Sequence, residues 1–379
     1  MLLKFIHGGN IRKVREQFGK KNLIDFSASI NPFGPSARAL GAIKRCAINR
    51  TPAVLLRAKL TRGQTATFNP LMHYPDTDCK QLREKLARCL RVNACNIVAG
   101  NGSIEIIYLI ARTFKPKNPA IVIPTFSDYE LALRQAKNVT NLRFIKRLEK
   151  DNFIFPMKEV VDAMNKIDLL FLCNPNNPTG DLIPKSSLIE LIEIALKKKI
   201  FLVLDETFID FCLAHSVLKY APENKYLVIL RSFSKLWGLP GLRLGYAVSH
   251  YKTIQKLKEH QEPWTVNALA QIAGIESLKD RAHFSRSVRF IKNESNFLFE
   301  QINKITGLKA YTPSANFIFV KISADMSSRE LYNKCGKKGM IIRDCSNFRG
   351  LDNRFIRLAV RSRKENLKLL TVLKGGLNG

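Results

Sequence analysis

The sequence has no apolar run long enough to cross a lipid bilayer. Residues 1–20 lack an apolar core followed by a small-residue cleavage site, so we expect no secretory signal. The eight cysteines are scattered without a CxxC pair or metal-type spacing, so we expect no metal site. These features favour reduced thiols in the cytoplasm over a disulfide framework or a membrane protein.

Acidic residues are scarce, with 31 Asp and Glu against 62 Lys and Arg and a net charge of +31. The deficit is greatest over residues 26–75, where there is no acidic residue at all. Such a balance can indicate a nucleic-acid partner. However, the basic residues are spread along the chain, and no basic block is interleaved with aromatics, so we expect no specific nucleic acid. The alternatives are a lysine-rich composition and attraction of doubly anionic substrates.

The length and the apolar content are ample for a large core. The chain has 379 residues, of which 46% are hydrophobic. That size predicts two domains, or one large domain with a lobe, rather than a disordered chain.

The window 227–246 carries the strongest chemical signal, LVILRSFSKLWGLPGLRLGY. Its apolar start predicts a buried strand, which is followed by Ser232, Ser234 and Lys235, and then by Arg243. A lysine between hydroxyls and near an arginine fits a Schiff-base lysine whose cofactor phosphate is bound by Ser and Arg donors. The alternative is a surface lysine on a loop, since most lysines are exposed.

Two other stretches carry side chains that suit the same chemistry. Asp205 ends the apolar run of LVLDETFID. A carboxylate there can pair with a protonated pyridine nitrogen, and a helix-capping Asp is the alternative. Asn177 lies in CNPNNPTG, where two X-Pro steps project it from a rigid turn. It can then donate to a ring hydroxyl, and an ordinary Asn-Pro turn is the alternative.

A phosphate site is predicted in IVAGNGSIEII. Gly102, Ser103 and Ile104 follow an expected strand and open an expected helix. Backbone N–H groups at a helix start bind anions. Together with the two serines and the arginine of the window 227–246, they would form a binding site for the cofactor phosphate, the phosphate cup. An ordinary strand-to-helix turn is the alternative.

The order Asn177, Asp205, Lys235, Arg243 resembles the fold-type I pyridoxal-phosphate enzymes, and within them the histidinol-phosphate aminotransferase-like group. The resemblance covers nearly the whole chain. It implies an α/β fold, with a large domain whose mostly parallel central sheet lies between helices and a smaller α+β domain. It also implies pyridoxal 5'-phosphate as cofactor and a homodimer, with Tyr74 crossing the interface.

The resemblance sets the expected segment boundaries. Residues 1–45 form an N-terminal arm and the start of the small domain, and 46–70 form a basic insertion that we interpret as a solvated loop. Residues 71–265 form the large cofactor-binding domain, and 266–379 form the C-terminal small domain. We expect the long helical region that follows to begin within Gln261 to Ala270.

Residues on the substrate side also come from resemblance. The start FIHGGN is similar to the His-Gly-Gly-Asn arm of threonine-phosphate decarboxylases of the cobalamin pathway. Phe126 matches an aromatic that stacks on the pyridine ring, and plain core is the alternative. The expected substrate-binding residues are His7, Gly9, Asn10, Asn31, Tyr74, Arg343, Arg357 and Arg361. The three arginines lie among apolar strand residues, where a guanidinium needs an anionic partner, with structural salt bridges as the alternative.

The choice among reactions depends on the same residues. Phe208 stands where histidinol-phosphate aminotransferases have a tyrosine hydroxyl, and the C-terminal segments also resemble the decarboxylases. We therefore expect loss of CO2 from L-threonine O-3-phosphate, giving (R)-1-amino-2-propanol O-2-phosphate, with Lys235 and Asp205 as catalytic residues. An aminotransferase and a non-catalytic binding protein of this fold remain open, as does serine phosphate as substrate, because one methyl group discriminates weakly.

Overall fold

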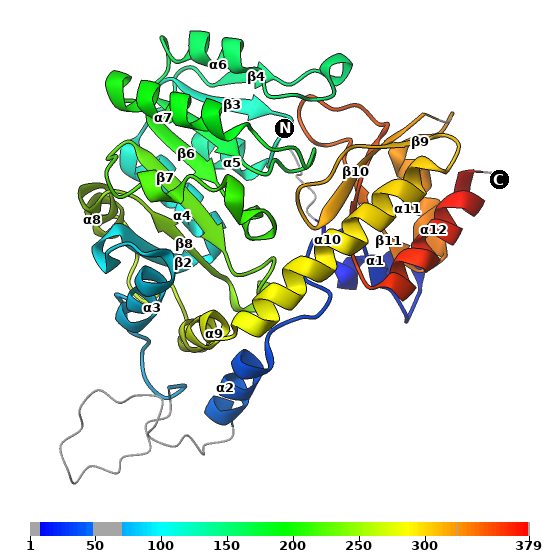
Figure 1. Cartoon of the computed structure of the whole chain (residues 1–379), viewed down its shortest axis with the longest axis horizontal. Helices are drawn as coiled ribbons and strands as arrows, with labels where there is room; N and C mark the ends of the chain where they lie inside the picture. Colours follow the sequence, from blue (N-terminus) through cyan, green and yellow to red (C-terminus); the bar gives the residue numbers. More distant parts are fainter. Residues whose placement is uncertain (1–7, 48–69, 324, 378–379) are drawn as a thin grey trace.

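The computed structural model describes residues 8–47, 70–323 and 325–377 (Figure 1). Two lobes are visible in Figure 1, a larger one around a seven-stranded sheet and a smaller one around a four-stranded sheet. Nearly all of the predicted insertion 46–70 lies outside the described residues, as does His7.

The large sheet is mostly parallel, as predicted. Its strand order is β2-β8-β7-β6-β5-β3-β4, and β8 alone runs antiparallel to its neighbours, β2 and β7. In chain order its strands are β2 (Ile97–Asn101), β3 (Pro119–Ile123), β4 (Arg143–Lys146), β5 (Leu169–Cys173), β6 (Phe201–Asp205), β7 (Leu227–Ser232) and β8 (Leu244–Val248).

The sheet is buried on both faces because its strands are continuously apolar. Alternate residues of β5 enter different cores: Leu170 and Leu172 pack on one side, Leu169 and Phe171 on the other. One face is covered by α3 (Lys80–Leu90), α6 (Met157–Ala163), α7 (Lys185–Lys198) and α9 (Ala268–Lys279). The other face is covered by α4 (Gly102–Phe114), α5 (Asp128–Gln135) and α8 (Tyr251–Glu259).

The small lobe is built on an antiparallel sheet of order β12-β13-β10-β9. Its strands are β9 (Leu308–Ala310), β10 (Phe317–Ile322), β12 (Arg343–Asp344) and β13 (Phe355–Ala359). Its helices are α10 (Arg281–Asn303), α11 (Ser328–Lys337) and α12 (Arg363–Leu377). The N-terminal α1 (Ile11–Phe18) contacts α11, and β1 (Ile24–Asp25) pairs with β11 (Met340–Ile341), so the arm belongs to this lobe.

The structure shows where the predicted helical region starts and what its first helix packs against. The helical region begins with α9 at Ala268, within the predicted stretch Gln261 to Ala270, after a turn with Pro263 and the left-handed Trp264. Asn267 then caps α9 by accepting the N–H of Ala270 at 2.9 Å. In addition, α9 packs on α3, on β8 and on α2 (Ala37–Ala47), within the core of the large lobe. This packing associates α9 with the large lobe, while the predicted segment boundaries stay a prediction.

Candidate active site

The ends of three parallel strands bring the predicted polar residues to one edge of the large sheet. Cys173 ends β5, Asp205 ends β6 and Ser232 ends β7. Parallel neighbours end at the same edge, which is where ligands bind in open α/β sheets. Lys235 follows three residues after β7 in a turn that returns the chain to β8, so the sheet itself sets the lysine beside the carboxylate.

Asp205 is a buried carboxylate held in one orientation. It is 4% exposed and accepts hydrogen bonds from the Tyr129 hydroxyl at 2.7 Å and the Thr207 N–H at 2.8 Å. Burial raises the pKa of Asp205, while the bonds from Thr207 and Tyr129 and the charge of Lys235 oppose the rise. Tyr129 stacks on Phe171 at 4.9 Å between ring centroids. A cation placed against this carboxylate would relieve the cost of burying it.

Sequence reasoning missed Tyr129, although it lies in the stretch that carries Phe126. The tyrosine is fully buried, and burial beside Asp205 raises its pKa well above the ordinary value, so the hydroxyl stays a donor. Only the contact with a strand 76 residues further along reveals its role. Phe126 itself is half-buried and meets the Tyr129 ring edge-on at 5.6 Å.

Lys235 is half-buried and has a perturbed amine. Burial lowers the pKa of Lys235 to about 8; the positive charges of Arg357 and Arg243 add to this, and Asp205 opposes it. The Nζ atom lies 5.1 Å from the centroid of the Phe208 ring. The amine is therefore within electrostatic range of Asp205 and both arginines, and it is available as a free base at a lower pH than an ordinary lysine.

Arg357 reaches the same space from the small lobe. Its Nη1 donates to the Asn177 side-chain oxygen and its Nη2 to the Ser27 carbonyl at 2.8 Å. Its buried Nε has no hydrogen-bond partner among the described residues. Burial lowers the pKa of Arg357 to about 10. A guanidinium that is 7% exposed and faces no carboxylate in the described contacts has the chemistry of an anion receptor.

Arg343 lies next to Arg357, because the two residues are directly paired across β12 and β13. Its Nη2 donates to Asn347 at 2.7 Å, and burial lowers the pKa of Arg343. A cavity of about 160 Å³ opens beside it, lined also by Lys13 of α1 and Arg329 of α11. Two neighbouring arginines and a cavity lined by three cations and one acid, Asp344, suit a ligand with two anionic groups.

The predicted phosphate cup is assembled at the start of α4. Gly102, Ser103 and Ile104 are its first residues, so their N–H groups have no acceptor within the helix. Gly102 has φ +80°, and a Cβ there would lie 2.4 Å from Nη2 of Arg243. A Cβ on Gly245 would lie 2.3 Å from the Ser103 nitrogen. These glycines let the guanidinium and β8 approach the helix start closely.

The two serines of the cup adjoin this site along the chain. Ser232 ends β7 and accepts a hydrogen bond from the Ser234 N–H at 3.1 Å. Both side chains are largely buried. With donors from a helix start, two hydroxyls and an arginine, and with Lys235 and Asp205 nearby, the residues present fit pyridoxal phosphate.

Other predicted residues have contacts of a different kind. The Asn31 amide donates to the Leu236 carbonyl at 2.7 Å and to Ser287 at 2.8 Å, which ties the lysine-bearing turn to α10. Arg361 pairs with Glu365 at 2.9 Å and donates to the Asp25 carbonyl at 3.1 Å. These contacts indicate that Asn31 positions the lysine-bearing turn and that Arg361 has a structural role. Direct contact of either residue with the substrate stays a prediction.

The N-terminal arm is described only from residue 8. The Gly9 N–H donates to the Ser27 hydroxyl at 2.9 Å, beside the carbonyl that Arg357 binds. Asn10 caps α1 by accepting the Lys13 N–H at 3.1 Å. The arm therefore borders the Arg343 cavity, and the described contact of Asn10 is that of a helix cap.

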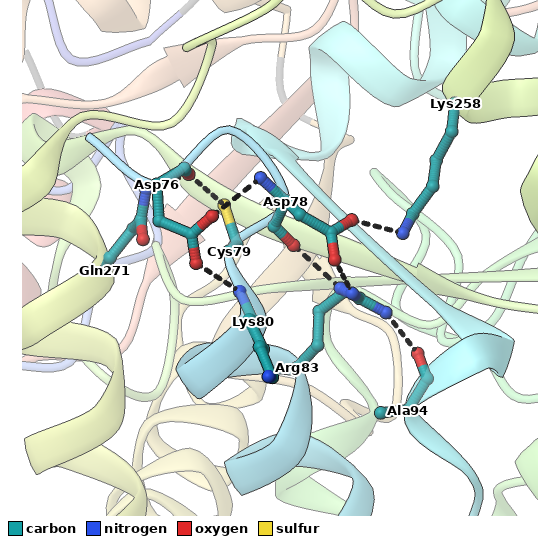
Figure 2. A network of polar contacts seen from close by, with 8 residues as sticks. All are labelled: Asp76, Asp78, Cys79, Lys80, Arg83, Ala94, Lys258 and Gln271. Atoms are coloured by element: carbon teal, nitrogen blue, oxygen red, sulfur yellow. Dashed lines mark hydrogen bonds and ion pairs between the residues drawn. The ribbon is translucent and has the colours of Figure 1, made fainter. Parts of the chain in front are cut away.

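Tyr74 is 80% exposed and stacks on Trp264, with 4.7 Å between ring centroids. The following segment is firmly anchored, as Figure 2 shows. Asp78 binds both Arg83 and Lys258, and Gln271 donates to the Asp76 carbonyl at 2.9 Å. The tyrosine is thus held at the surface by a backbone fixed to α3, α8 and α9.

Among the described residues, no cluster of His, Cys, Asp and Glu is arranged to bind a metal ion. In the same part of the chain, no helix has the length and apolarity needed to span a membrane. All eight cysteines are free thiols.

The sheet, its two covering layers and the Lys235–Asp205 pair at the strand ends define the fold-type I aminotransferase architecture. The chain belongs to the aminotransferase class I and II family, whose model matches residues 21–373. It is 34% identical to the threonine-phosphate decarboxylase of Salmonella typhimurium, with 100% of this chain and 98% of the relative covered.

Two solved structures extend the comparison. The histidinol-phosphate aminotransferase of Clostridium acetobutylicum has a TM-score of 0.83 at 30% identity, covering 94% of this chain and 99% of that one. The L-threonine-O-3-phosphate decarboxylase of Porphyromonas gingivalis has a TM-score of 0.78 at 26% identity, covering 93% and 99%. The chain is therefore similar to members with two different reactions.

Proposed function

We propose that this protein is a pyridoxal-phosphate-dependent decarboxylase that converts L-threonine O-3-phosphate to (R)-1-amino-2-propanol O-2-phosphate and CO2. The observation that carries the proposal is the pair of buried arginines, Arg343 and Arg357, set side by side on one face of β12 and β13. The substrate carries a carboxylate and a phosphate, which is the number of anionic groups that such a pair can bind. The similarity to decarboxylases over the full chain supports it.

Each residue is assigned a role by what it contacts. Pyridoxal phosphate, when bound, supplies an aldehyde that reacts with amines and a ring that withdraws electrons from the bonds at the substrate Cα. Lys235 offers its amine to that aldehyde and later returns a proton to Cα. Asp205, oriented by Tyr129, holds the proton on the ring nitrogen. The α4 start, Ser232, Ser234 and Arg243 bind the cofactor phosphate.

The bond that breaks depends on how the substrate is oriented. Only a bond held perpendicular to the cofactor ring overlaps its electron system. Arg357 binds the substrate carboxylate and Arg343 its phosphate, so that the Cα–carboxylate bond takes that direction. His7, Gly9 and Asn10 of the arm contribute to the phosphate side. The Cα–carboxylate bond would break with its electron pair left on Cα, CO2 would leave, and a proton from Lys235 would then bond to Cα, which balances the reaction.

The protein would act as a homodimer in the cytoplasm and supply the nucleotide loop of cobalamin. Tyr74 supports the dimer, because an exposed aromatic pair with Trp264 on an anchored segment is suited to a partner's surface. The free thiols suit a reducing compartment.

A histidinol-phosphate aminotransferase is the second candidate, and it is favoured by the 30% identity to a solved member of that group. One local feature speaks against it. Phe208, in place of the expected tyrosine, packs edge-on against Phe317 at 5.1 Å and has no hydroxyl to offer the cofactor ring.

The two functions are separated by offering the purified protein two reactions. We expect O-phosphothreonine alone to yield 1-amino-2-propanol phosphate, and histidinol phosphate with 2-oxoglutarate to yield little glutamate. If glutamate forms faster than 1-amino-2-propanol phosphate, the decarboxylase proposal is overturned. If neither product forms while the protein binds the cofactor, the binding-protein alternative gains support.

A further inference from the structure

A cavity of about 770 Å³ opens on the large lobe, and none of its lining residues belongs to the candidate active site. It lies between the segment after α3 and the two single-turn helices Leu213–His215 and Leu218–Tyr220, which follow β6. Its size is that of a small-molecule site. The proposed decarboxylation uses none of the residues that line this cavity.

The walls of the cavity are fixed by buried polar contacts. Arg231 donates from Nε to Glu206 at 2.9 Å and from Nη2 to the Ser216 hydroxyl at 2.9 Å. The same hydroxyl donates to Glu206 at 2.8 Å. Another lining residue, Asn96, donates from its side-chain amide to the Ser249 carbonyl at 2.9 Å. A wall held by buried hydrogen bonds is already formed before a ligand arrives.

The lining combines apolar and cationic side chains. Leu213 and Tyr251 expose 46% and 47% of their surface, which is high for large apolar side chains. Arg91 and Lys219 stand at the rim, and within the described part of the chain neither forms an ion pair. The charge of Arg231 is more than balanced by Glu206 and Asp210, so the lining cations left to bind a ligand are Arg91 and Lys219, against one lining acid, Glu223.

We propose that this cavity is a second ligand site, for a small molecule that carries an anionic group on an apolar body. The apolar body would cover Leu213 and Tyr251, and the anion would pair with Arg91 and Lys219. Such a ligand suits the site better than a cation, because the rim cations would repel one.

Two cysteine thiols can report whether a molecule is bound in this cavity. Of the chain's eight cysteines only Cys89 and Cys95 are exposed, and both line this cavity. A bound molecule would therefore shield both reactive thiols at once, whereas binding elsewhere would shield neither.

The test uses the holoenzyme and 1-anilinonaphthalene-8-sulfonate, which joins an apolar ring system to an anion. We expect saturable fluorescence, and slower alkylation of Cys89 and Cys95 by iodoacetamide when the probe is bound. The variant Arg91→Glu/Lys219→Glu should bind the probe about tenfold more weakly. The matched control, Lys197→Glu/Lys292→Glu, makes the same charge change at exposed sites outside the cavity and should bind normally.

Three results would overturn the proposal. These are the absence of saturable binding, probe fluorescence without protection of the two thiols, and equal affinity in the charge-reversed variant and its control. If a variant fails to fold, the protection of Cys89 and Cys95 from alkylation in the unaltered protein still tests the proposal. None of these readouts depends on decarboxylation, so the outcome is independent of the proposed function.

Discussion

At the scale of single residues, the candidate site places Lys235 and Asp205 in buried surroundings that disfavour their charged forms. Burial lowers the pKa of Lys235 and raises that of Asp205, so both groups are pushed toward their neutral forms when no ligand is bound. A cofactor that bonds the amine and brings a protonated nitrogen to the carboxylate would relieve both costs. The site is therefore built for a partner with those two features.

Removing the amine tests the first feature. Lys235→Ala should abolish the visible absorbance of the purified protein, because no other lysine in this account is placed to bond the aldehyde. Lys219→Ala, an exposed lysine outside the active site, should keep the absorbance. A visible band that persists in Lys235→Ala would show that the lysine is misassigned.

The pKa of Lys235 makes a second prediction. A neutral amine is the nucleophile, and burial lowers its pKa from the ordinary 10.5 to about 8. The reactive fraction therefore rises with pH through about 8 and is complete above it. The initial rate at which cofactor-free protein regains its visible absorbance with added pyridoxal phosphate should follow that curve. A rate that keeps rising toward pH 10.5 would contradict it.

Tyr129 provides the residue-level test of Asp205. Tyr129→Phe removes the hydroxyl that donates to the carboxylate at 2.7 Å, so the pKa of Asp205 rises further and its anion pairs less well with the cofactor nitrogen. We expect cofactor affinity to fall by about 1–3 kcal/mol, measured by equilibrium dialysis. Tyr108→Phe, on the neighbouring α4, is the control, and an equal loss in both variants would show a packing effect.

At the scale of elements, the strands were the most predictable part of the molecule. The apolar start of the window 227–246 is strand β7, and Gly102 opens α4 directly after β2, as predicted. The apolar runs that end at Cys173 and Asp205 are strands as well. Burial on both faces makes each run continuously apolar, which is why it can be recognised without knowledge of its neighbours. The helix α9 begins at Ala268, inside the predicted stretch, after a proline-containing turn that separates it from α8.

The candidate site was predictable where its residues end strands or open a helix. Lys235, Asp205 and Gly102 belong to this group. The Tyr129–Asp205 contact and the Arg343–Arg357 pairing could not be predicted, because each joins segments that are brought together only by the fold. Asn31 resembled a pocket residue in the sequence, yet its amide is bonded to the Leu236 backbone and to α10.

The loop between β12 and β13 links the two lobes. Arg349 in this loop forms two hydrogen bonds, of 2.8 and 2.9 Å, with the buried carboxylate of Glu130 in α5. Two residues earlier, Asn347 accepts from Arg343. The ion pair thus fixes the loop that orients one of the predicted substrate arginines against the large lobe.

Breaking this pair should affect substrate binding more than turnover. For Arg349→Gln we expect KM for O-phosphothreonine to rise about tenfold with kcat nearly unchanged, the loss expected for one oriented charge-assisted bond. Arg354→Gln, which breaks a more exposed pair with Asp352, should leave KM close to normal. Steady-state kinetics decide, and a fall in kcat at constant KM would contradict the positioning role.

At the scale of the whole molecule, both lobes contribute residues to the proposed reaction, and the net charge of +31 suits its anionic substrate. The large lobe supplies the amine, the carboxylate and the phosphate cup, and the small lobe supplies the paired arginines. The excess of positive charge favours encounter with a substrate that carries two anionic groups. It also predicts non-specific adsorption to polyanions at low salt, which does not require a nucleic-acid function.

The central claim is that this arrangement directs cleavage to the Cα–carboxylate bond. Its most direct test is to incubate the holoenzyme with O-phosphothreonine labelled with carbon-13 at the carboxyl carbon, in the presence of 2-oxoglutarate, and to follow the label. We predict that the label appears as CO2, in equal amount to 1-amino-2-propanol phosphate, with no glutamate formed. Label retained in a phosphorylated 2-oxo acid, with a matching amount of glutamate, would contradict the account.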